Sequence, residues 1–263
     1  MGNKRLFFFD IDGTIKAEED GYIPESAIVS IQKLRENGHR VFINTGRTSM
    51  YVRDEIRSIG FDGYVFGCGT EVVLGDERIY RRRSDAELCR VLAKAVRSCG
   101  AAPVYERSDA MFIDSKARII PGMQALLEQF ERDSVHAQDM NEDKSFCFDK
   151  FVIWYDEKTD MSRFRRIIDG IFKYVDRGYG FAEMVPEGCS KASGMEKILD
   201  KTGMKREDTV AFGDSLNDCE MLRLAGLGIA MGGANALYPY ADYVTKELKK
   251  NGIAFALKQN GFI

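Results

Sequence analysis

Two aspartates stand two positions apart directly after an apolar run, in Phe7-Phe8-Phe9-Asp10-Ile11-Asp12-Gly13-Thr14. The run has the length of a buried strand, so Asp10 and Asp12 are expected at one strand end. Because residues two apart on an extended chain face the same side, both carboxylates could enter one small volume. A divalent cation or a retained proton would relieve their repulsion. An ordinary turn explains these residues equally well when they are taken alone, since Asp-Gly is a common turn pair.

Polar groups also follow two other predicted strands. Thr45 and Gly46 come after the apolar segment 41–44, and Gly213-Asp214-Ser215-Leu216-Asn217-Asp218 comes after the segment 210–212. Open parallel sheets bind ligands beyond the carboxyl ends of their strands. If the three strands lie side by side, all these groups converge on one site, which favours chemistry over three unrelated turns.

These groups suit a phosphate ligand. Thr45 supplies a hydroxyl, and Gly46 would let the backbone approach an anion where a following helix directs its N–H groups. Asp214 and Asp218 lie four apart where a helix begins and can share a face, although helix capping explains Asp218 equally well. Lys191 falls in the first turn of another predicted helix, where a cation opposes the macrodipole by roughly 0.3 to 1 kcal/mol. We interpret it as facing the carboxylates and a bound phosphate.

Predicted strands and helices alternate at both ends of the chain. Before residue 82, strands at 7–9, 41–44 and 64–66 alternate with helical patterns at 24–36 and from about 49, and a hairpin joins 72–74 to 79–81. After residue 186, helices at 192–202, 217–225 and 252–257 alternate with strands at 210–212 and 227–231. Between them the pattern is mixed, with helices at 87–96, 121–130 and 163–174 and strands at 103–106, 111–113, 151–155 and 181–185.

This pattern predicts an α/β protein with a Rossmann-like parallel-sheet core and an inserted α+β domain. The core is assigned to residues 1–81 and 186–263, and the insert to residues 82–185. The main domain is therefore expected to be discontinuous in sequence.

Composition narrows the classes of function. The chain has 263 residues, a formal net charge of −3 and a sequence pI near 5.6, so it lacks the overall basic field of a nucleic-acid-binding protein. Arg81-Arg82-Arg83 is interpreted as a strand end or an anion contact. No run approaches the roughly 18 apolar residues that span a bilayer, so we expect no membrane partner and a cytoplasmic location.

Cysteine and histidine usage argues against other metal and nucleophile chemistries. The six cysteines form no C-x-x-C pair, so they are interpreted as reduced thiols. The only two histidines, His39 and His136, poorly supply a zinc site or a histidine-based triad.

Taken in order, the chemical groups amount to a recognisable set. Asp10-x-Asp12-Gly13-Thr14, Thr45-Gly46-Arg47, Lys191 and Gly213-Asp214-Ser215-Leu216-Asn217-Asp218 resemble the four motifs of the haloacid dehalogenase-like (HAD) hydrolase superfamily. The resemblance spans essentially the whole chain. The insert resembles the α/β cap of the Cof-like subgroup, subclass IIB, and Ala241-Asp242-Tyr243-Val244-Thr245 is similar to that subgroup's ending.

Two loops depart from the Cof-like pattern. Gly67-Cys68-Gly69-Thr70 stands where many such sequences have Asn-Gly-Ala, and Gly232-Gly233-Ala234 stands where they have Gly-Asn-Ala. The departures leave the motif chemistry intact, but a substrate cannot be carried over from the subgroup.

The resemblance implies a role for each motif residue. Asp10 would be the nucleophile that forms an aspartyl-phosphate, and Asp12 the general acid and base. Mg²⁺ would be held by the Asp10 side chain, the Asp12 backbone carbonyl and Asp214, with Asp218 supporting both the ion and Lys191. The implied phosphate-binding residues are Thr45, Gly46, Lys191 and Asn217.

The sequence thus predicts a Mg²⁺-dependent phosphatase that hydrolyses a small phosphorylated metabolite, with sugar phosphates as the favoured class. Two alternatives stay open: a phosphosugar mutase of the same superfamily, and a non-catalytic protein that senses or binds phosphate ligands. The cap is expected to set substrate specificity. Neither the metabolite nor an oligomeric partner is predicted.

Overall fold

The computed structural model describes residues 4–82, 84–132 and 135–263. The chain forms two compact units: a core of Met1–Arg47, Tyr51–Arg81 and Cys189–Ile263, and a second unit, here called the cap, of Thr48–Met50 and Arg82–Gly188. The boundaries at residues 82 and 185 remain our proposed domain assignment. Arg83, in the arginine cluster noted above, lies outside the described residues.

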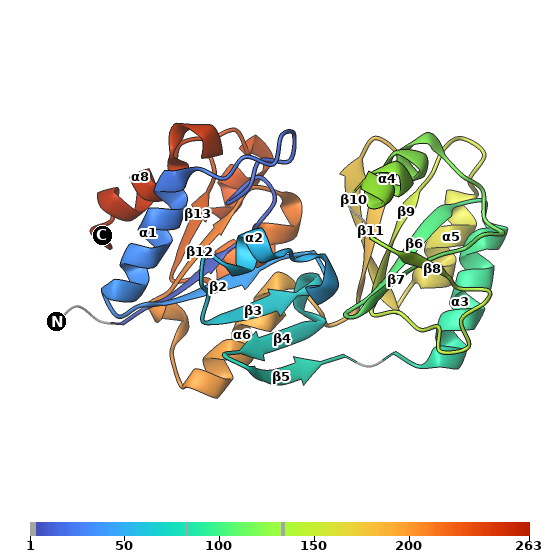
Figure 1. Cartoon of the computed structure of the whole chain (residues 1–263), viewed down its shortest axis with the longest axis horizontal. Coiled ribbons are helices and arrows are strands. Elements are labelled where there is room, and N and C mark those ends of the chain that lie inside the picture. Colours follow the sequence, from blue (N-terminus) through green and yellow to red (C-terminus); the bar gives the residue numbers. More distant parts are fainter. Residues whose placement is uncertain (1–3, 83, 133–134) are drawn as a thin grey trace. The chain divides into compact units, whose positions relative to one another are not determined.

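The core contains a mostly parallel sheet whose described strands run in the order β14-β13-β12-β1-β2-β3-β4-β5 (Figure 1). Its strands are β1 (Leu6–Phe9), β2 (Arg40–Asn44), β3 (Gly63–Phe66), β4 (Glu71–Leu74), β5 (Glu77–Arg81), β12 (Thr209–Gly213), β13 (Leu227–Ala230) and β14 (Tyr243–Val244). Strand β1 is central, and it pairs in parallel with β12 on one side and β2 on the other. The predicted parallel core is confirmed, and the three strand ends that carry polar groups are neighbours.

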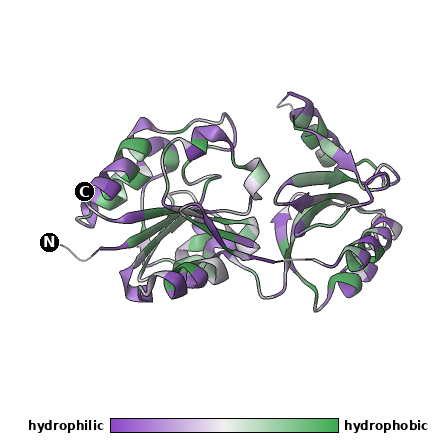
Figure 2. Ribbon diagram, turned by 60° about the horizontal axis from the view of Figure 1, so that its bottom comes forward, coloured by the Kyte–Doolittle hydropathy of each residue, from purple (hydrophilic) through white to green (hydrophobic). Residues whose placement is uncertain are grey.

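Strand β1 is apolar throughout because helices cover both faces of the sheet. Phe7 and Phe9 point into one hydrophobic cluster, and Leu6 and Phe8 point into the opposite one. The first cluster is covered by α1 (Glu25–Glu36), α2 (Asp54–Arg57) and α8 (Gly252–Gln259), and the second by α6 (Lys191–Thr202) and α7 (Cys219–Leu224). Hydrophobic residues accordingly line the strands between the helices in Figure 2. Full burial of each such side chain contributes about 1.5 to 3 kcal/mol, which secures the strand that leads to Asp10.

The segment after β2 differs from the helix predicted near residue 49. A short 3₁₀ turn spans Ser49–Tyr51, and the α-helix α2 begins only at Asp54 and has four residues. The expectation that a helix directly after Gly46 would offer its N–H groups to an anion is therefore wrong. The backbone is held otherwise here, because the Arg47 N–H donates to Thr45 Oγ1 and the Arg47 carbonyl accepts from Gly67.

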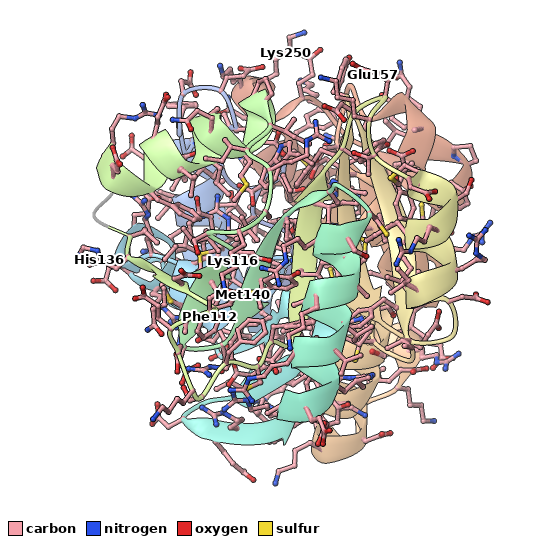
Figure 3. All side chains as sticks on the ribbon, turned by 90° about the vertical axis from the view of Figure 1, so that its right-hand side faces the viewer. Phe112, Lys116, His136, Met140, Glu157 and Lys250 are labelled. Atoms are coloured by element: carbon pink, nitrogen blue, oxygen red, sulfur yellow. The ribbon has the colours of Figure 1, made fainter. Side chains whose placement is uncertain are left out.

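The cap contains a second, mainly antiparallel sheet, whose described strands run in the order β10-β11-β9-β6-β7-β8. Its strands are β6 (Ala102–Arg107), β7 (Ala110–Ile113), β8 (Ala137–Asp139), β9 (Lys150–Trp154), β10 (Phe172–Gly178) and β11 (Phe181–Pro186). Its helices are α3 (Ala86–Ser98), α4 (Pro121–Arg132) and α5 (Met161–Ile168). Helices α3 and α5 pack on one face over an aromatic core that includes Tyr105 and Phe151. Phe112 and Met140, labelled in Figure 3, belong to the same core.

One predicted element of the cap is wrong. The helix predicted at 163–174 ends at Ile168, and Phe172 begins strand β10, which pairs with β11. The apolar residues at 167, 168, 171 and 172 mimic a continuing helical stripe. Gly170, with φ of +68°, breaks it, because a left-handed residue cannot continue a right-handed helix. The short strands β8 and β14 were not predicted, since runs of two or three residues carry little alternation.

Candidate active site

Three carboxylates from different parts of the chain meet at the carboxyl ends of the central strands. Asp10 follows β1, Asp214 follows β12, and Asp218 ends the 3₁₀ turn Leu216–Asp218. Among the described residues, one oxygen of each carboxylate lies within 4.8 Å of the other two. Asp10 and Asp218 are buried. Such a cluster is unfavourable unless cations or retained protons offset the repulsion.

Lys191 supplies one of these cations. Its Nζ lies 2.8 Å from Asp10 Oδ1 and 2.6 Å from Asp218 Oδ1, and its side chain is fully buried. The residue occupies the first position of α6, where the Ser190 side chain caps the helix and accepts from Ser193. The electrostatic cost of a lysine at this helix end is thus offset by two short contacts with carboxylates.

The protonation of the cluster reflects both burial and charge. Burial raises the pKa of Asp10 well above its ordinary value; Lys191 lowers it, while Asp218, Asp214 and Asp12 raise it. Burial and the Asp218 charge raise the pKa of Asp214 to about 7. Burial lowers the pKa of Lys191, but Asp10 and Asp218 outweigh that effect and raise it overall. One lysine therefore only partly neutralises the three carboxylates, and the cluster favours a further cation.

Local hydrogen bonds orient two of the carboxylates. Asp218 Oδ2 accepts the N–H groups of Asp214 and Ser215, each at 3.0 Å, so Asp218 mainly holds the loop and Lys191. Asp214 Oδ1 accepts from the Thr14 hydroxyl at 2.9 Å. Gly13 is required beside this contact, because a Cβ at its position would lie 2.1 Å from Asp214 Oδ2 and its φ is +78°.

This donor set fits a hard divalent cation. Carboxylate oxygens are the ligands that Mg²⁺ prefers, and Asp10 and Asp214 are less fully engaged by protein donors than Asp218. The structure brings together three of the four predicted metal residues. The Asp12 carboxylate does not join them; it pairs with Arg47, which leaves the Asp12 backbone carbonyl as the predicted ligand atom.

Metal affinity should depend on pH through Asp214. Since the pKa of Asp214 is about 7 in the fold and that of Asp10 is also raised, we expect Mg²⁺ binding to weaken as pH falls through 7, because protons compete with the ion for both carboxylates. Without metal, a carboxyl whose folded pKa is raised binds more protons than in the unfolded chain. The metal-free protein should therefore lose stability as pH rises from about 4 through 7. Thermal melts with and without Mg²⁺ at pH 5.5 and pH 8 check both expectations.

The matched variant Asp214→Asn should reduce this pH dependence and leave the part that comes from Asp10, whereas the exposed Asp200→Asn on α6 should leave it unchanged. Equal Mg²⁺ stabilisation of the wild type at the two pH values would contradict the assignment.

The predicted phosphate-binding residues lie around the same strand ends. Thr45 is buried after β2, and its Oγ1 accepts from the Arg47 N–H, so its hydroxyl proton can be donated to a ligand. Asn217 Oδ1 accepts from Ser215 Oγ at 2.9 Å, and the residue is partly buried in the loop after β12. Gly46 directly follows Thr45 in a partly exposed loop.

Three residues in or beside this site were given no role from the sequence. Thr14 orients Asp214, and Arg47 pairs with Asp12; both lie within the recognised motifs, which was their only signal. Asn44 Nδ2 donates to the Lys191 carbonyl at 2.9 Å and to Met221 Sδ at 3.0 Å, joining β2 to two helices. Asn44 had no sequence signal, because it reads as the polar end of a strand.

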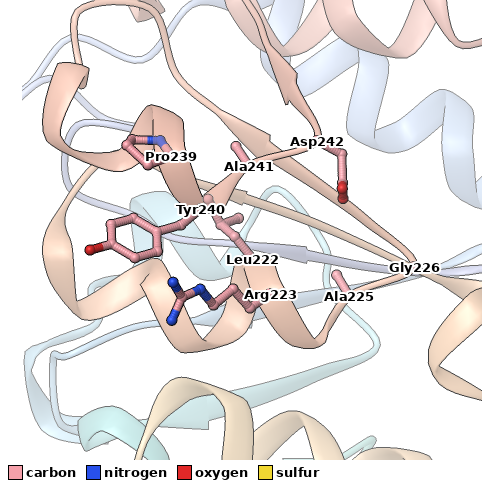
Figure 4. A pocket seen from close by; sticks show the side chains of 8 residues that line it. All are labelled: Leu222, Arg223, Ala225, Gly226, Pro239, Tyr240, Ala241 and Asp242. Carbon is pink, nitrogen blue, oxygen red and sulfur yellow. The ribbon is translucent and has the colours of Figure 1, made fainter.

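Two hollows in the core differ in their relation to this site. A hollow of about 320 Å³ adjoins the carboxylates and is lined by Gly13 and Asp214. Another, of about 310 Å³, lies by the amino ends of β13 and β14 and contains none of the predicted site residues (Figure 4).

The two histidines lie outside the carboxylate cluster. His39 packs against Phe7 and accepts from the Arg5 N–H, and His136 is exposed (Figure 3). Neither histidine is in the carboxylate cluster.

In the part of the chain that the structure describes, no helix has the length and apolar character needed to cross a membrane.

Comparisons with known proteins agree with this geometry. The family model of the haloacid dehalogenase-like hydrolases matches residues 7–257. YkrA of Bacillus subtilis (strain 168) is 30% identical and covers 99% of both chains. The 5-amino-6-(5-phospho-D-ribitylamino)uracil phosphatase YitU of the same organism is 28% identical, over 97% of this chain and 96% of that protein.

A solved structure shows the same relationship. The HAD subclass IIB sugar phosphatase BT4131 superimposes with a TM-score of 0.84 at 26% identity, over 99% of this chain and 100% of that one. The α/β core and its cap agree with that subclass. The chain therefore belongs to the haloacid dehalogenase-like hydrolases, in their Cof-like subgroup, and is an enzyme of the phosphatase type.

Proposed function

We propose that this phosphatase depends on Mg²⁺ and hydrolyses a small phosphorylated metabolite, with sugar phosphates as the favoured class, through an aspartyl-phosphate on Asp10. The observation that carries the proposal is the placement of Asp10. It lies at the end of the central strand, 2.8 Å from Lys191 and in one cluster with Asp214 and Asp218. This arrangement supports the proposal that Asp10 is the nucleophile, with Lys191 as a cation and the carboxylate oxygens as metal ligands beside it.

The first step joins Asp10 to the substrate. A carboxylate oxygen of Asp10 forms a bond to phosphorus as the bond from phosphorus to the leaving oxygen breaks. Asp12 passes a proton to that leaving oxygen, and an alcohol departs. Thr45, Gly46, Asn217 and Lys191 are proposed to bind the phosphoryl oxygens.

The second step releases phosphate. Asp12, now a carboxylate, takes a proton from a water molecule whose oxygen attacks phosphorus, and the bond between Asp10 and phosphorus breaks. The chain returns to its starting state, with the proton back on Asp12.

Charge explains why cations are needed at this position. A carboxylate at about 4 Å from each unit of phosphate charge is repelled by roughly 4 kcal/mol at an effective dielectric of 20. Lys191 offsets part of this repulsion. When bound, Mg²⁺ would be held by Asp10, the Asp12 carbonyl and Asp214, near Asp218, and would supply the remaining charge stabilisation.

The substrate class is proposed from the relatives. BT4131 is described as a sugar phosphatase, and the substrate in the name of YitU carries a phosphoribityl group. We propose that the cap, residues 82–185, selects the group attached to the phosphate. A small phosphorylated metabolite and a cytoplasmic location are proposed on the same basis; nucleic acid and membranes are not proposed as partners.

A metabolite screen tests this function. We expect the purified full-length chain with Mg²⁺ to release phosphate from at least one member of a panel of phosphorylated sugars, nucleotides and pyridoxal phosphate. EDTA should abolish the release, and added Mg²⁺ should restore it, because Lys191 alone does not neutralise the cluster. Free phosphate and isomerised sugar phosphate are measured together by phosphate assay and NMR.

The products discriminate among the alternatives. Isomerised sugar phosphate that forms faster than free phosphate would identify a mutase. Tight binding of a phosphorylated ligand without turnover, by folded and metal-loaded protein, would identify a non-catalytic binding protein. Either result would overturn the proposed hydrolysis.

A further inference from the structure

The Asp12 carboxylate is held by both of its oxygens. Arg47 Nε lies 2.7 Å from Asp12 Oδ2, and Arg47 Nη2 lies 2.5 Å from Asp12 Oδ1. The Arg47 side chain is 17% exposed and that of Asp12 is 29% exposed, so the pair is shielded but can be reached. A two-pronged contact of this kind fixes the direction and plane of the carboxylate as well as its distance.

Arg47 is itself held in place by the core. Its backbone N–H donates to Thr45 Oγ1 at 3.1 Å, and its carbonyl accepts from the Gly67 N–H at 2.8 Å. Its guanidinium lies 5.1 Å from the centre of the Tyr51 ring, and Nη1 donates to the Tyr51 carbonyl at 3.4 Å. Because both ends of the residue are anchored, little side-chain freedom is lost when Arg47 orients Asp12.

We propose that Arg47 is a positioning residue that sets the orientation of Asp12 for proton transfer to the leaving oxygen. This inference rests on the proposed phosphatase mechanism. As the bond from phosphorus to the leaving oxygen breaks, the proton moves from Asp12 to that oxygen, and Asp12 is left as a carboxylate. The Arg47 fork matches the geometry of that carboxylate, so Arg47 acts on the chemistry through Asp12.

A competing role for Arg47 is direct binding of the substrate phosphate, because a guanidinium also pairs well with phosphate. The two roles differ in how they respond to the leaving group. Loss of a phosphate contact weakens the reaction of every phosphate ester alike. Loss of proton-transfer geometry slows esters whose alkoxide must be protonated, and it spares those whose leaving group departs as a stable anion.

Two small synthetic substrates separate these roles. Benzyl phosphate releases an alkoxide that needs a proton, and p-nitrophenyl phosphate releases a phenolate that leaves without one. For Arg47→Gln, we expect kcat/KM to fall at least about tenfold more for benzyl phosphate than for p-nitrophenyl phosphate. Arg47→Lys keeps the charge, but lysine cannot form the bidentate contact with both carboxylate oxygens. It should therefore show the same larger loss of kcat/KM for benzyl phosphate. Melting temperatures identify any variant that is unfolded, in which case the other variant carries the test.

A double variant and a matched control sharpen the result. Asp12→Asn should show the same selectivity, and adding Arg47→Gln to it should cause no further selective loss, since the two residues act as a unit. Arg223→Gln is the control. Its guanidinium lies 4.3 Å from the centre of the Tyr240 ring beside the hollow in Figure 4. Its loss should leave kcat/KM unchanged for both substrates.

A failure of the positioning role can be told apart from a failure of the proposed phosphatase function. Equal losses on both substrates in folded Arg47 variants, or no loss, would overturn the positioning role while leaving the phosphatase proposal in place. Absence of metal-dependent turnover of any phosphate ester by the wild type would overturn the proposed function itself.

Discussion

Replacing Asp10 by asparagine should abolish turnover, with kcat lowered by at least about 10³-fold on the best substrate of the panel. The amide has nearly the same shape as the carboxylate but is not a nucleophile for phosphorus. The fold should survive, because Lys191 keeps its 2.6 Å contact with Asp218, and a buried carboxyl that is costly to ionise has been removed. Steady-state kinetics and a thermal melt measure the two effects.

A covalent readout makes the test specific. Wild-type protein that is quenched in acid during turnover should carry one phosphoryl group on the peptide containing Asp10, and the Asp10→Asn variant should carry none. Asp200→Asn changes an exposed aspartate of α6 and should keep both turnover and the labelled peptide. Full turnover by Asp10→Asn, or a label on another residue, would exclude Asp10 as the nucleophile.

Removing the cation of the cluster should have the second large effect. Lys191→Met leaves Asp10 and Asp218 without their shared partner, and the loss of one member of a buried ion pair commonly costs about 3 to 5 kcal/mol of folding free energy. Activity should also be lost, since Lys191 is proposed to bind the phosphate. Chemical denaturation monitored by circular dichroism gives the free energy of unfolding.

The loss of stability should depend on pH in a defined direction. Without Lys191, the pKa of Asp10, already raised by burial, rises further, so the folded state binds more protons than the unfolded chain. Stability therefore falls as pH rises from about 4, and Lys191→Met should be more destabilised at pH 8 than at pH 5. The control, Lys201→Met, removes a half-exposed lysine that pairs with Glu77, and should change stability by at most about 1 kcal/mol. A similar small change for Lys191→Met at pH 8 would show that the buried pair is dispensable.

Much of the fold could be predicted because its signals are local. The apolar run of β1 has to be buried on both faces, which requires a central strand with helices on each side, as found. The error at 163–174 had a physical cause. Apolar spacing across Asp169-Gly170 fits a helix, and only pairing with β11 decides that Phe172 begins a strand.

At the candidate site, the residues could be predicted from local signals but their distances could not. Asp10, Asp214 and Asp218 could be selected because they follow strands whose ends a parallel sheet brings together, and Lys191 because a lysine in the first turn of a helix opposes the macrodipole. Their distances could not be predicted, since they depend on the register of β12 beside β1 and on the position of α6. Asn44 illustrates this limit, because its contact with the Lys191 carbonyl joins residues that are 147 positions apart.

By itself the sequence determined the motifs, their order and the class of chemistry, because these depend on residue types at short spacing. Only the tertiary structure decided which charged side chains pair with one another. Asp12, expected to share one small volume with Asp10, lies outside the cluster of Asp10, Asp214 and Asp218, and its carboxylate pairs with Arg47, 35 positions along the chain. Lys191 lies between Asp10 and Asp218, Arg47 pairs with Asp12, and burial raises the pKa of Asp214. These arrangements depend on contacts among the ends of the central strands and the start of α6, which exist only once the sheet and its helices have packed together.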